Sequence, residues 1–197
     1  IEVFAEVFEL LGGAEVKAYF KDGDEIKKTQ KIADLSGDAH ILLSGERVAL
    51  NLLQRLSGIA TRTRAAADAV AGTKARITDT RKTTPLMRNL EKYAVRCGGG
   101  HNHRIGLSDG VLIKDNHIAA AGGIAQAVKS ARDAIPHTLK IEVETETIDQ
   151  VQQAIDAGAD IIMLDNMTPA QMREAVALVN GKALTEASGN MGDRDLR

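Results

Sequence analysis

Residues 139–166 read LKIEVETETIDQVQQAIDAGADIIMLDN, and this stretch decides the fold. It contains two short apolar runs, Leu139–Val143 and Ile161–Leu164, on either side of an amphipathic segment. Thr147 predicts the start of a helix in that segment, and Gly158 predicts its end. Short apolar runs joined by a helix are typical of buried parallel strands. The stretch therefore predicts one strand–helix–strand unit of a parallel sheet.

The same alternation extends on both sides of this unit. Three further apolar runs predict strands at Ala75–Thr78, Gly110–Ile113 and Ala183–Ala187. Amphipathic patterns predict helices near residues 87–97, 123–134, 147–157 and 169–179. Strands and helices alternating at this spacing indicate an α/β fold with a parallel sheet, either open or closed into a barrel.

Polar side chains at the ends of the predicted strands favour the barrel. Each of the five strands carries or runs into such residues: Asp79, Arg81 and Lys82; Lys114, Asp115 and Asn116; Glu142 and Glu144; Asp165 and Asn166; Glu186 and Ser188. Barrel enzymes build their sites from the carboxyl ends of several strands. An open doubly wound sheet uses one switch point, often with a Gly-rich turn, and no G-x-G-x-x-G follows a strand here.

The residues before the predicted barrel have a different pattern of predicted strands and helices. Residues 15–44 predict short strands and turns, and Glu46 to about Ala71 predicts a long helix. We therefore predict two domains, a partial N-terminal α/β domain over 1–72 and an α/β-barrel catalytic domain over 73–197. Because the chain opens on Ile1 rather than Met, we expect the N-terminal domain to be incomplete.

Composition narrows the classes of function. Hydrophobic residues make up 44% of the chain and aromatic residues only 3%, with a net charge of −2. Few aromatic platforms and no global positive field argue against a nucleic-acid partner. No apolar run approaches the length of a membrane span. The single Cys97 fits a reducing compartment, so we expect a cytoplasmic location.

The basic residues are concentrated in residues 74–114, which hold nine basic and three acidic residues, a net +6. This excess indicates either a solvated basic face or an anion site. Thr80-Arg81-Lys82-Thr83-Thr84-Pro85 offers a guanidinium fork, a point charge and, with a helix start at Pro85, free N–H groups. The alternative is an ordinary helix cap with exposed basic residues.

Three glycines, Gly98–Gly100, precede His101-Asn102-His103-Arg104. Such runs usually mark a close approach of backbone to a ligand or a mobile loop. A metal site of Cys97, His101 and His103 is an alternative, although no second ligand pair at zinc spacing follows. Further along, Lys114 is either an anion ligand or a surface residue, and His117 is either buried or a helix cap.

Glu142 and Glu144 alternate on one strand, so their side chains share a face. If that face is the barrel interior, both carboxylates converge with Asp165, which suits a hydrated Mg²⁺ held by few carboxylates and substrate phosphates. The alternative is the solvent face of an edge strand.

Together these segments resemble the quinolinate phosphoribosyltransferases, also called carboxylating nicotinate-nucleotide pyrophosphorylases, from about Val7 to the last residue. The matching motifs are Glu46-Arg47, Gln54–Thr61, Asp79–Pro85, Leu90–Val95, Gly98–Arg104 apart from position 101, Leu112–His117, Glu142–Glu144 and Met163–Met167. The chain departs from the family pattern at Leu86, where a glycine often follows the proline. The resemblance implies an open-faced N-terminal domain, an incomplete α/β barrel and an obligate homodimer with a shared active site.

The resemblance also implies the reaction and the site. Quinolinate and phosphoribosyl pyrophosphate would give nicotinate mononucleotide, pyrophosphate and CO₂, with Mg²⁺ as cofactor. It places Arg81, His103, Arg104 and Lys114 on quinolinate, with Arg47 reaching in from the other subunit. It places Lys82, Glu144 and Asp165 on phosphoribosyl pyrophosphate and its Mg²⁺, and Ser188 and Gly189 in a phosphate-binding turn. We expect a protein ending at Arg197 to be inactive or poorly stable, because five strand–helix units do not close a barrel.

Two rival functions remain open. A related phosphoribosyltransferase for nicotinate or another anionic heterocycle would need fewer basic groups around the base. A non-catalytic anion-binding or assembly protein could use the same scaffold, and an assay for pyrophosphate release separates it from an enzyme.

Overall fold

The computed structural model describes residues 1–196, which form two compact units, residues 1–105 and residues 106–196. The predicted domain boundary after residue 72 falls inside the first unit. None of the helices in residues 1–196 combines the length and apolar character that a bilayer crossing requires.

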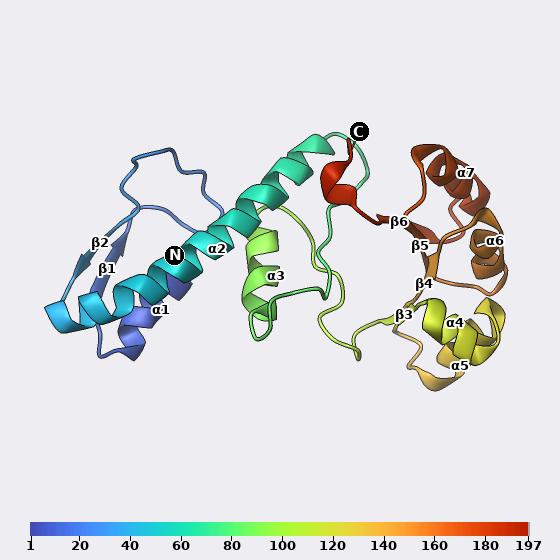
Figure 1. The fold of residues 1–197 in the computed structure, drawn as a ribbon, viewed down its shortest axis with the longest axis horizontal. Coiled ribbons are helices and arrows are strands. Elements are labelled where there is room, and N and C mark those ends of the chain that lie inside the picture. The colour runs from blue at the N-terminus through green and yellow to red at the C-terminus, as the bar shows by residue number, and fades with distance from the viewer. Residues whose placement is uncertain (197) are drawn as a thin grey trace. The chain divides into compact units, whose positions relative to one another are not determined.

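The first unit packs a two-stranded sheet and three helices (Figure 1). Its elements are α1 (Glu2–Leu10), β1 (Glu15–Ala18), β2 (Ala33–Ser36), α2 (Ala39–Ala69) and α3 (Arg88–Cys97). Strands β1 and β2 are antiparallel. The small core between α1 and α2 is formed by Phe4, Phe8 and Ala49, with the two phenylalanine rings edge to face at 5.3 Å.

Helix α2 begins at Ala39, seven residues before the predicted start, so that prediction was wrong at this end. The Asp38 carboxylate accepts a hydrogen bond of 2.8 Å from the His40 N–H and caps the helix. Its exposed side chains include Leu43 and Val48.

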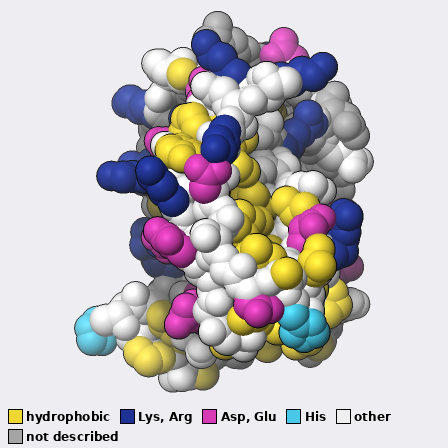
Figure 2. Space-filling model, turned by 90° about the vertical axis from the view of Figure 1, so that its left-hand side faces the viewer, with side chains coloured by type: hydrophobic (Ala, Val, Ile, Leu, Met, Phe, Trp, Pro, Cys, Tyr) yellow, Lys and Arg dark blue, Asp and Glu magenta, His cyan; other side chains and the backbone are white. Residues whose placement is uncertain are grey.

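On the face of the molecule shown in Figure 2, hydrophobic side chains are mixed with Lys, Arg, Asp and Glu side chains, and the described residues of this face carry no continuous basic surface.

The second unit is a four-stranded parallel sheet in the order β3-β4-β5-β6, followed by a 3₁₀ helix, Met191–Asp193. Its other elements are β3 (Val111–Ile113), α4 (Asp115–Ala121), α5 (Ile124–Ala134), β4 (Ile141–Thr145), α6 (Ile148–Asp156), β5 (Ile161–Asp165), α7 (Pro169–Val179) and β6 (Leu184–Ser188). The helices lie on one side of the sheet (Figure 1). Four of the predicted strands and the helices between them are therefore confirmed.

The register of this sheet separates an apolar face from a polar one. Alternate strand residues pack with the helices in the core, including Ile113, Ile141, Val143, Ile162 and Leu164. The residues between them share the opposite face because paired residues in a parallel sheet point the same way. The pairs on that face include Glu144 with Met163, Met163 with Glu186 and Asp165 with Ser188. This arrangement confirms that Glu142 and Glu144 share a face.

Helix caps follow the sequence signals closely in this unit. Thr147 accepts from the Gln150 N–H and Thr168 from the Gln171 N–H, each in a capping box. Gly158 and Gly181 follow helices α6 and α7 with positive φ, as predicted for stops.

Two further predictions in the first unit were wrong. Ala75–Thr78 is not a strand, because its pairing is limited to one isolated bridge between Thr78 and His101. The helix after the Thr-Arg-Lys motif starts at Arg88, not Pro85. A turn closed by the Met87 N–H and the Thr84 carbonyl precedes it, with Leu86 at a φ of 65°.

The three glycines have a packing role that the sequence did not reveal. A Cβ on Gly98 would lie 2.4 Å from the Ala60 carbonyl oxygen, and one on Gly100 would lie 2.7 Å from the Thr63 methyl group. Both contacts are to α2, so these glycines allow the end of α3 to approach α2 closely.

Candidate active site

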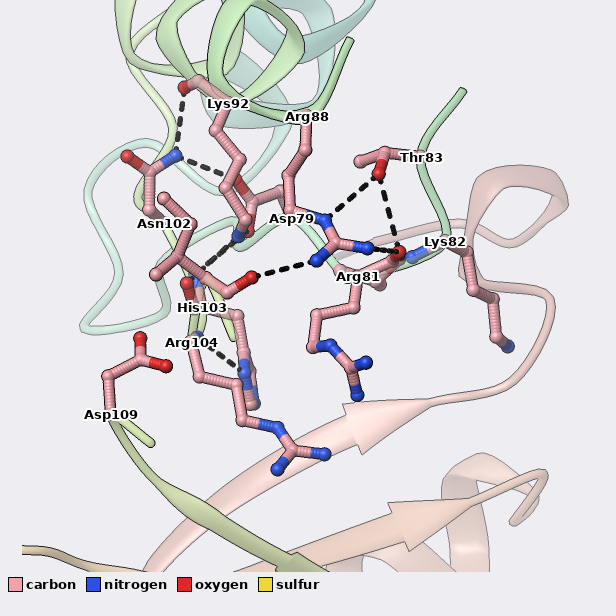
Figure 3. A network of polar contacts seen from close by, with 12 residues as sticks. Asp79, Arg81, Lys82, Thr83, Arg88, Lys92, Asn102, His103, Arg104 and Asp109 are labelled. Carbon is pink, nitrogen blue, oxygen red and sulfur yellow. Dashed lines mark hydrogen bonds and ion pairs between the residues drawn. The ribbon is translucent and has the colours of Figure 1, made fainter. Parts of the chain in front are cut away.

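A buried ion pair fixes the first group of predicted site residues. Lys92 of α3 pairs with Asp79, and their side chains are only 3% and 8% exposed. Lys92 also donates to the His103 carbonyl at 2.9 Å, and Asp79 accepts from the His103 N–H at 2.8 Å. The Asn102 amide donates to Asp79 and to the Lys92 carbonyl, which completes the network (Figure 3). The backbone of the His103 segment is therefore held against α3.

The His103 ring is oriented by its neighbour. Its Nδ1 accepts a hydrogen bond of 2.8 Å from the Arg104 N–H. In the neutral ring, Nδ1 must then be the unprotonated nitrogen and Nε2 carries the proton.

Arg81 contributes a guanidinium from the irregular segment after Asp79. Its Nε is buried and has no hydrogen-bond partner among the described residues. In Figure 3 the side chains of Arg81 and Arg104 extend the same way from the backbone. A buried N–H without a partner is costly unless a ligand satisfies it, so Arg81 suits an anion such as a carboxylate. Lys82 is exposed beside it.

Glu91 anchors the turn that follows this motif. Arg55 donates to Glu91 through Nε at 2.9 Å and through Nη2 at 2.6 Å, and it also contacts the Thr84 hydroxyl. The Thr84 N–H donates to the other Glu91 oxygen at 3.2 Å. Burial alone raises the pKa of the Glu91 carboxyl, but the hydrogen bonds from Arg55 and Thr84 outweigh it and hold the pKa below its usual range.

This lowered pKa predicts an acid-dependent loss of stability. The ionised carboxyl stabilises the fold fully above its unfolded pKa, and the contribution disappears as pH falls through the lower folded pKa. Urea unfolding should show Glu91→Gln to be less stable than wild type by about 1.5–3 kcal/mol at pH 7, the range for hydrogen bonds to charged groups. The difference should shrink between pH 5 and pH 3, and a constant difference over that range would contradict the role of the charge.

The second group of predicted residues lies at the carboxyl ends of the parallel strands. Lys114, directly after β3, donates a hydrogen bond of 2.8 Å to a carboxylate oxygen of Glu144 in β4. Asp165 ends β5 and accepts from the Asn166 amide at 2.7 Å. His117 serves as a helix cap, because its Nδ1 accepts from the Lys114 N–H at 3.0 Å. The geometry thus places an amine and two carboxylates on the polar edge of this sheet.

Gly189 follows Ser188 at the end of β6, and its lack of a side chain has a clear reason. A Cβ there would lie 2.7 Å from the Asn166 nitrogen, and its φ is +87°. Asn166 itself has a φ of 55°, and its N–H donates to the Ser188 carbonyl at 3.1 Å. Asn166 therefore links the end of β5 to the turn after β6 while it orients Asp165.

Comparison with known proteins shows to which family the chain belongs. The model of the quinolinate phosphoribosyl transferase C-terminal domain matches residues 59–197, and that of the N-terminal domain matches residues 1–57. The chain belongs to the quinolinate phosphoribosyltransferase family.

Several relatives have high sequence identity. A probable nicotinate-nucleotide pyrophosphorylase [carboxylating] of Bacillus subtilis (strain 168) is 57% identical over 87% of this chain and 59% of its own length. A protein of the same name from a Synechocystis strain is 48% identical over 95% of this chain and 65% of its own length. The crystal structure of NadC from Streptococcus pyogenes is 45% identical with a TM-score of 0.91, over 97% of this chain and 68% of that one. The chain thus spans about three fifths of the Bacillus relative's length.

In this quinolinate phosphoribosyltransferase chain, the predicted site residues are divided between the two units. Arg81, Lys82, His103 and Arg104 belong to the first unit, while Lys114, Glu144, Asp165, Ser188 and Gly189 belong to the second. Arg47 lies on an exposed turn of α2, with its side chain 73% exposed and its nearest acid, Glu46, at 4.0 Å. The described residues contain no metal-ligand group built on Cys97 and His101, so that alternative has no support.

Sequence reasoning assigned no role to the residues that hold the predicted site residues in place. Asp79, Lys92 and Asn102 form the buried network, Arg88 bonds the Arg81 segment, and Asn166 orients Asp165. Asp79 was noted as a polar residue at a predicted strand end and Lys92 as part of a matching motif, but neither was assigned a partner. Their spacing of 13 residues gives no periodic signal of a contact.

Proposed function

We propose that the protein transfers a phosphoribosyl group from phosphoribosyl pyrophosphate to quinolinate, with decarboxylation, giving nicotinate mononucleotide, pyrophosphate and CO₂. The observation that carries this proposal is the buried Arg81 Nε, which has no hydrogen-bond partner among the described residues. Arg81 and Arg104 are planar forks suited to carboxylates, and the His103 ring lies next to Arg104, whose N–H bonds its Nδ1. Quinolinate is a dianion, and these donors together suit two adjacent carboxylates.

The division of charge supports two roles. Arg81, His103 and Arg104 would bind the pyridine dicarboxylate, with Lys114 as a further cation. Lys82 would bind the phosphoribosyl pyrophosphate, and Ser188 and Gly189 would contact a phosphate. Lys114 is paired with Glu144, so each group compensates the other's charge.

The carboxylates fit a Mg²⁺ ion. Glu144 and Asp165 offer hard oxygen donors on the same face of neighbouring strands, and each already accepts one hydrogen bond that orients it. Bound there with the substrate's phosphates, the ion would neutralise charge on the leaving pyrophosphate.

The chain's own residues would act by positioning and electrostatics. The bond from the ribose C1′ to pyrophosphate breaks as the pyridine nitrogen forms a new bond to C1′, and pyrophosphate leaves with the bonding electrons. The nitrogen then carries a positive charge. The adjacent carboxylate leaves as CO₂, and the ring carbon keeps its electron pair and takes a proton. The arginines would hold the ring against the ribose throughout.

Product stoichiometry tests this function. Purified protein that carries this chain within the full length of its relatives should release one pyrophosphate and one CO₂ for each quinolinate consumed, and only when phosphoribosyl pyrophosphate and Mg²⁺ are both present. Nicotinate used in place of quinolinate should give no product. Turnover of nicotinate would favour the related phosphoribosyltransferase, and no pyrophosphate release with either base would favour the non-catalytic scaffold.

We also propose a homodimer with shared sites, in the cytoplasm. The exposed Arg47 lies beside the exposed apolar side chains Leu43 and Val48 on α2, and a second copy of the chain would bury this surface.

Subunit mixing tests the shared site. Arg47→Ala and Arg104→Ala subunits should each be nearly inactive alone. After subunit exchange, about a quarter of wild-type turnover should return, because half the subunits form hybrids with one intact site in two. Arg173→Ala, on the exposed surface of α7, is the control for handling losses. No recovery after confirmed exchange would count against the shared site.

A further inference from the structure

Arg88, the first residue of α3, bonds to both segments that carry the predicted arginine ligands. Its Nη2 donates to the Arg81 carbonyl at 3.3 Å, and its Nη1 donates to the Ile105 carbonyl at 3.1 Å. Its Nε donates to the Thr83 hydroxyl at 3.2 Å (Figure 3). One guanidinium thus joins the backbone beside Arg81 to the backbone beside Arg104, with all three of its nitrogens engaged.

The two segments have no regular structure. Asp79 also links them, through the hydrogen bonds that it accepts from Asn102 and the His103 N–H. Residues 80–87 and residues 102–105 lie outside helices and strands. The turn at Leu86 has a positive φ and a fully exposed side chain, so it is strained and little packed. A cavity of about 410 Å³ is lined by Thr83, Arg88 and Ile105, among others, and leaves the turn room to shift.

The spacing of two arginines matters for one class of ligand. Adjacent carboxylates on a rigid ring have a fixed separation, so both are bound only if the two cations match it. A ring with a single carboxylate needs one cation and is insensitive to the spacing. Loss of the Arg88 bridge should therefore affect dicarboxylates selectively.

We propose that Arg88 is a positioning residue that sets the spacing of Arg81 and Arg104, and thereby the preference for an aromatic 1,2-dicarboxylate over a monocarboxylate. The inference rests on the proposed function, since it takes Arg81 and Arg104 to be the ligands of the dicarboxylate. Arg88 itself need not touch the substrate, because its guanidinium is engaged with protein acceptors.

The test measures a ratio of affinities in Arg88→Met and Arg88→Lys. Dissociation constants of quinolinate and nicotinate are determined by calorimetry, with thermal melting in parallel. We expect Arg88→Met to weaken quinolinate binding by about tenfold or more and nicotinate binding by less than about threefold. Arg88→Lys keeps the charge but cannot bridge both carbonyls, so it should lose most of the preference while staying folded.

Arg132→Met is the matched control. Arg132 of α5 also donates to a backbone carbonyl, that of Gly158 at 3.0 Å, and to Asp160 at 2.8 Å, but in the second unit. Its loss should lower the melting temperature and leave the affinity ratio unchanged. A ratio unchanged in Arg88→Lys, and in Arg88→Met if it folds, would overturn the positioning role. Wild-type protein that does not bind quinolinate would instead refute the proposed function.

Discussion

Replacing Lys92 by Met should lower the free energy of unfolding by about 3–5 kcal/mol, the range for removing one partner of a buried ion pair. The Asp79 carboxylate would remain buried, with its charge opposed only by hydrogen bonds from Asn102 and the His103 N–H. The His103 carbonyl would also lose its donor. Urea denaturation with a two-state fit measures the change.

Lys129→Met is the control for this prediction. Lys129 pairs with Asp133 on α5, but the side chains are 76% and 65% exposed. An exposed pair of this kind contributes little to stability, because solvent screens it. If Lys92→Met and Lys129→Met cost the same, the buried network would not be what holds the His103 segment.

Asp165→Asn and Glu144→Gln should each lower kcat by about 10²–10³-fold, the scale seen when one electrostatic stabiliser of a transition state is removed. Both substitutions keep the shape of the side chain and remove the charge that the Mg²⁺ and phosphoribosyl side of the site would use. Steady-state kinetics at saturating substrates and Mg²⁺ measure the loss. Quinolinate affinity should change by less than about threefold in Asp165→Asn.

Glu146→Gln provides the matched control for these variants, because Glu146 is exposed just after β4. It should keep wild-type turnover. Near-normal kcat in Asp165→Asn or Glu144→Gln at saturating Mg²⁺ would remove that residue from the proposed metal site.

The sequence predicted the second unit well because its signals are local. Apolar strands, Thr caps and Gly stops each depend on residues a few positions apart, and the structure places strands β3 to β6 where the apolar runs are. Alternation also predicted correctly that Glu142 and Glu144 share a face. Helix α4, which directly follows β3 and has no buried residues, was not predicted because its seven residues are too short for a clear period.

The first unit was harder to predict because its contacts are distant in sequence. The glycines at 98 and 100 reflect packing against Ala60 and Thr63 of α2, which no local pattern reveals. The same holds for Arg55, which lies 36 residues before its partner Glu91. Charged residues such as Lys92 look solvated in a sequence, and only the fold shows that this one is buried.

The affinity of Arg104→Ala for quinolinate tests most directly the claim that the basic segment of the first unit binds the dicarboxylate. Isothermal titration should show binding weakened by about 1.5–3 kcal/mol, the value of a hydrogen bond to a charged group. Arg173→Ala, which removes an exposed arginine from α7, should bind as wild type does. Unchanged quinolinate affinity in folded Arg104→Ala protein would contradict the account.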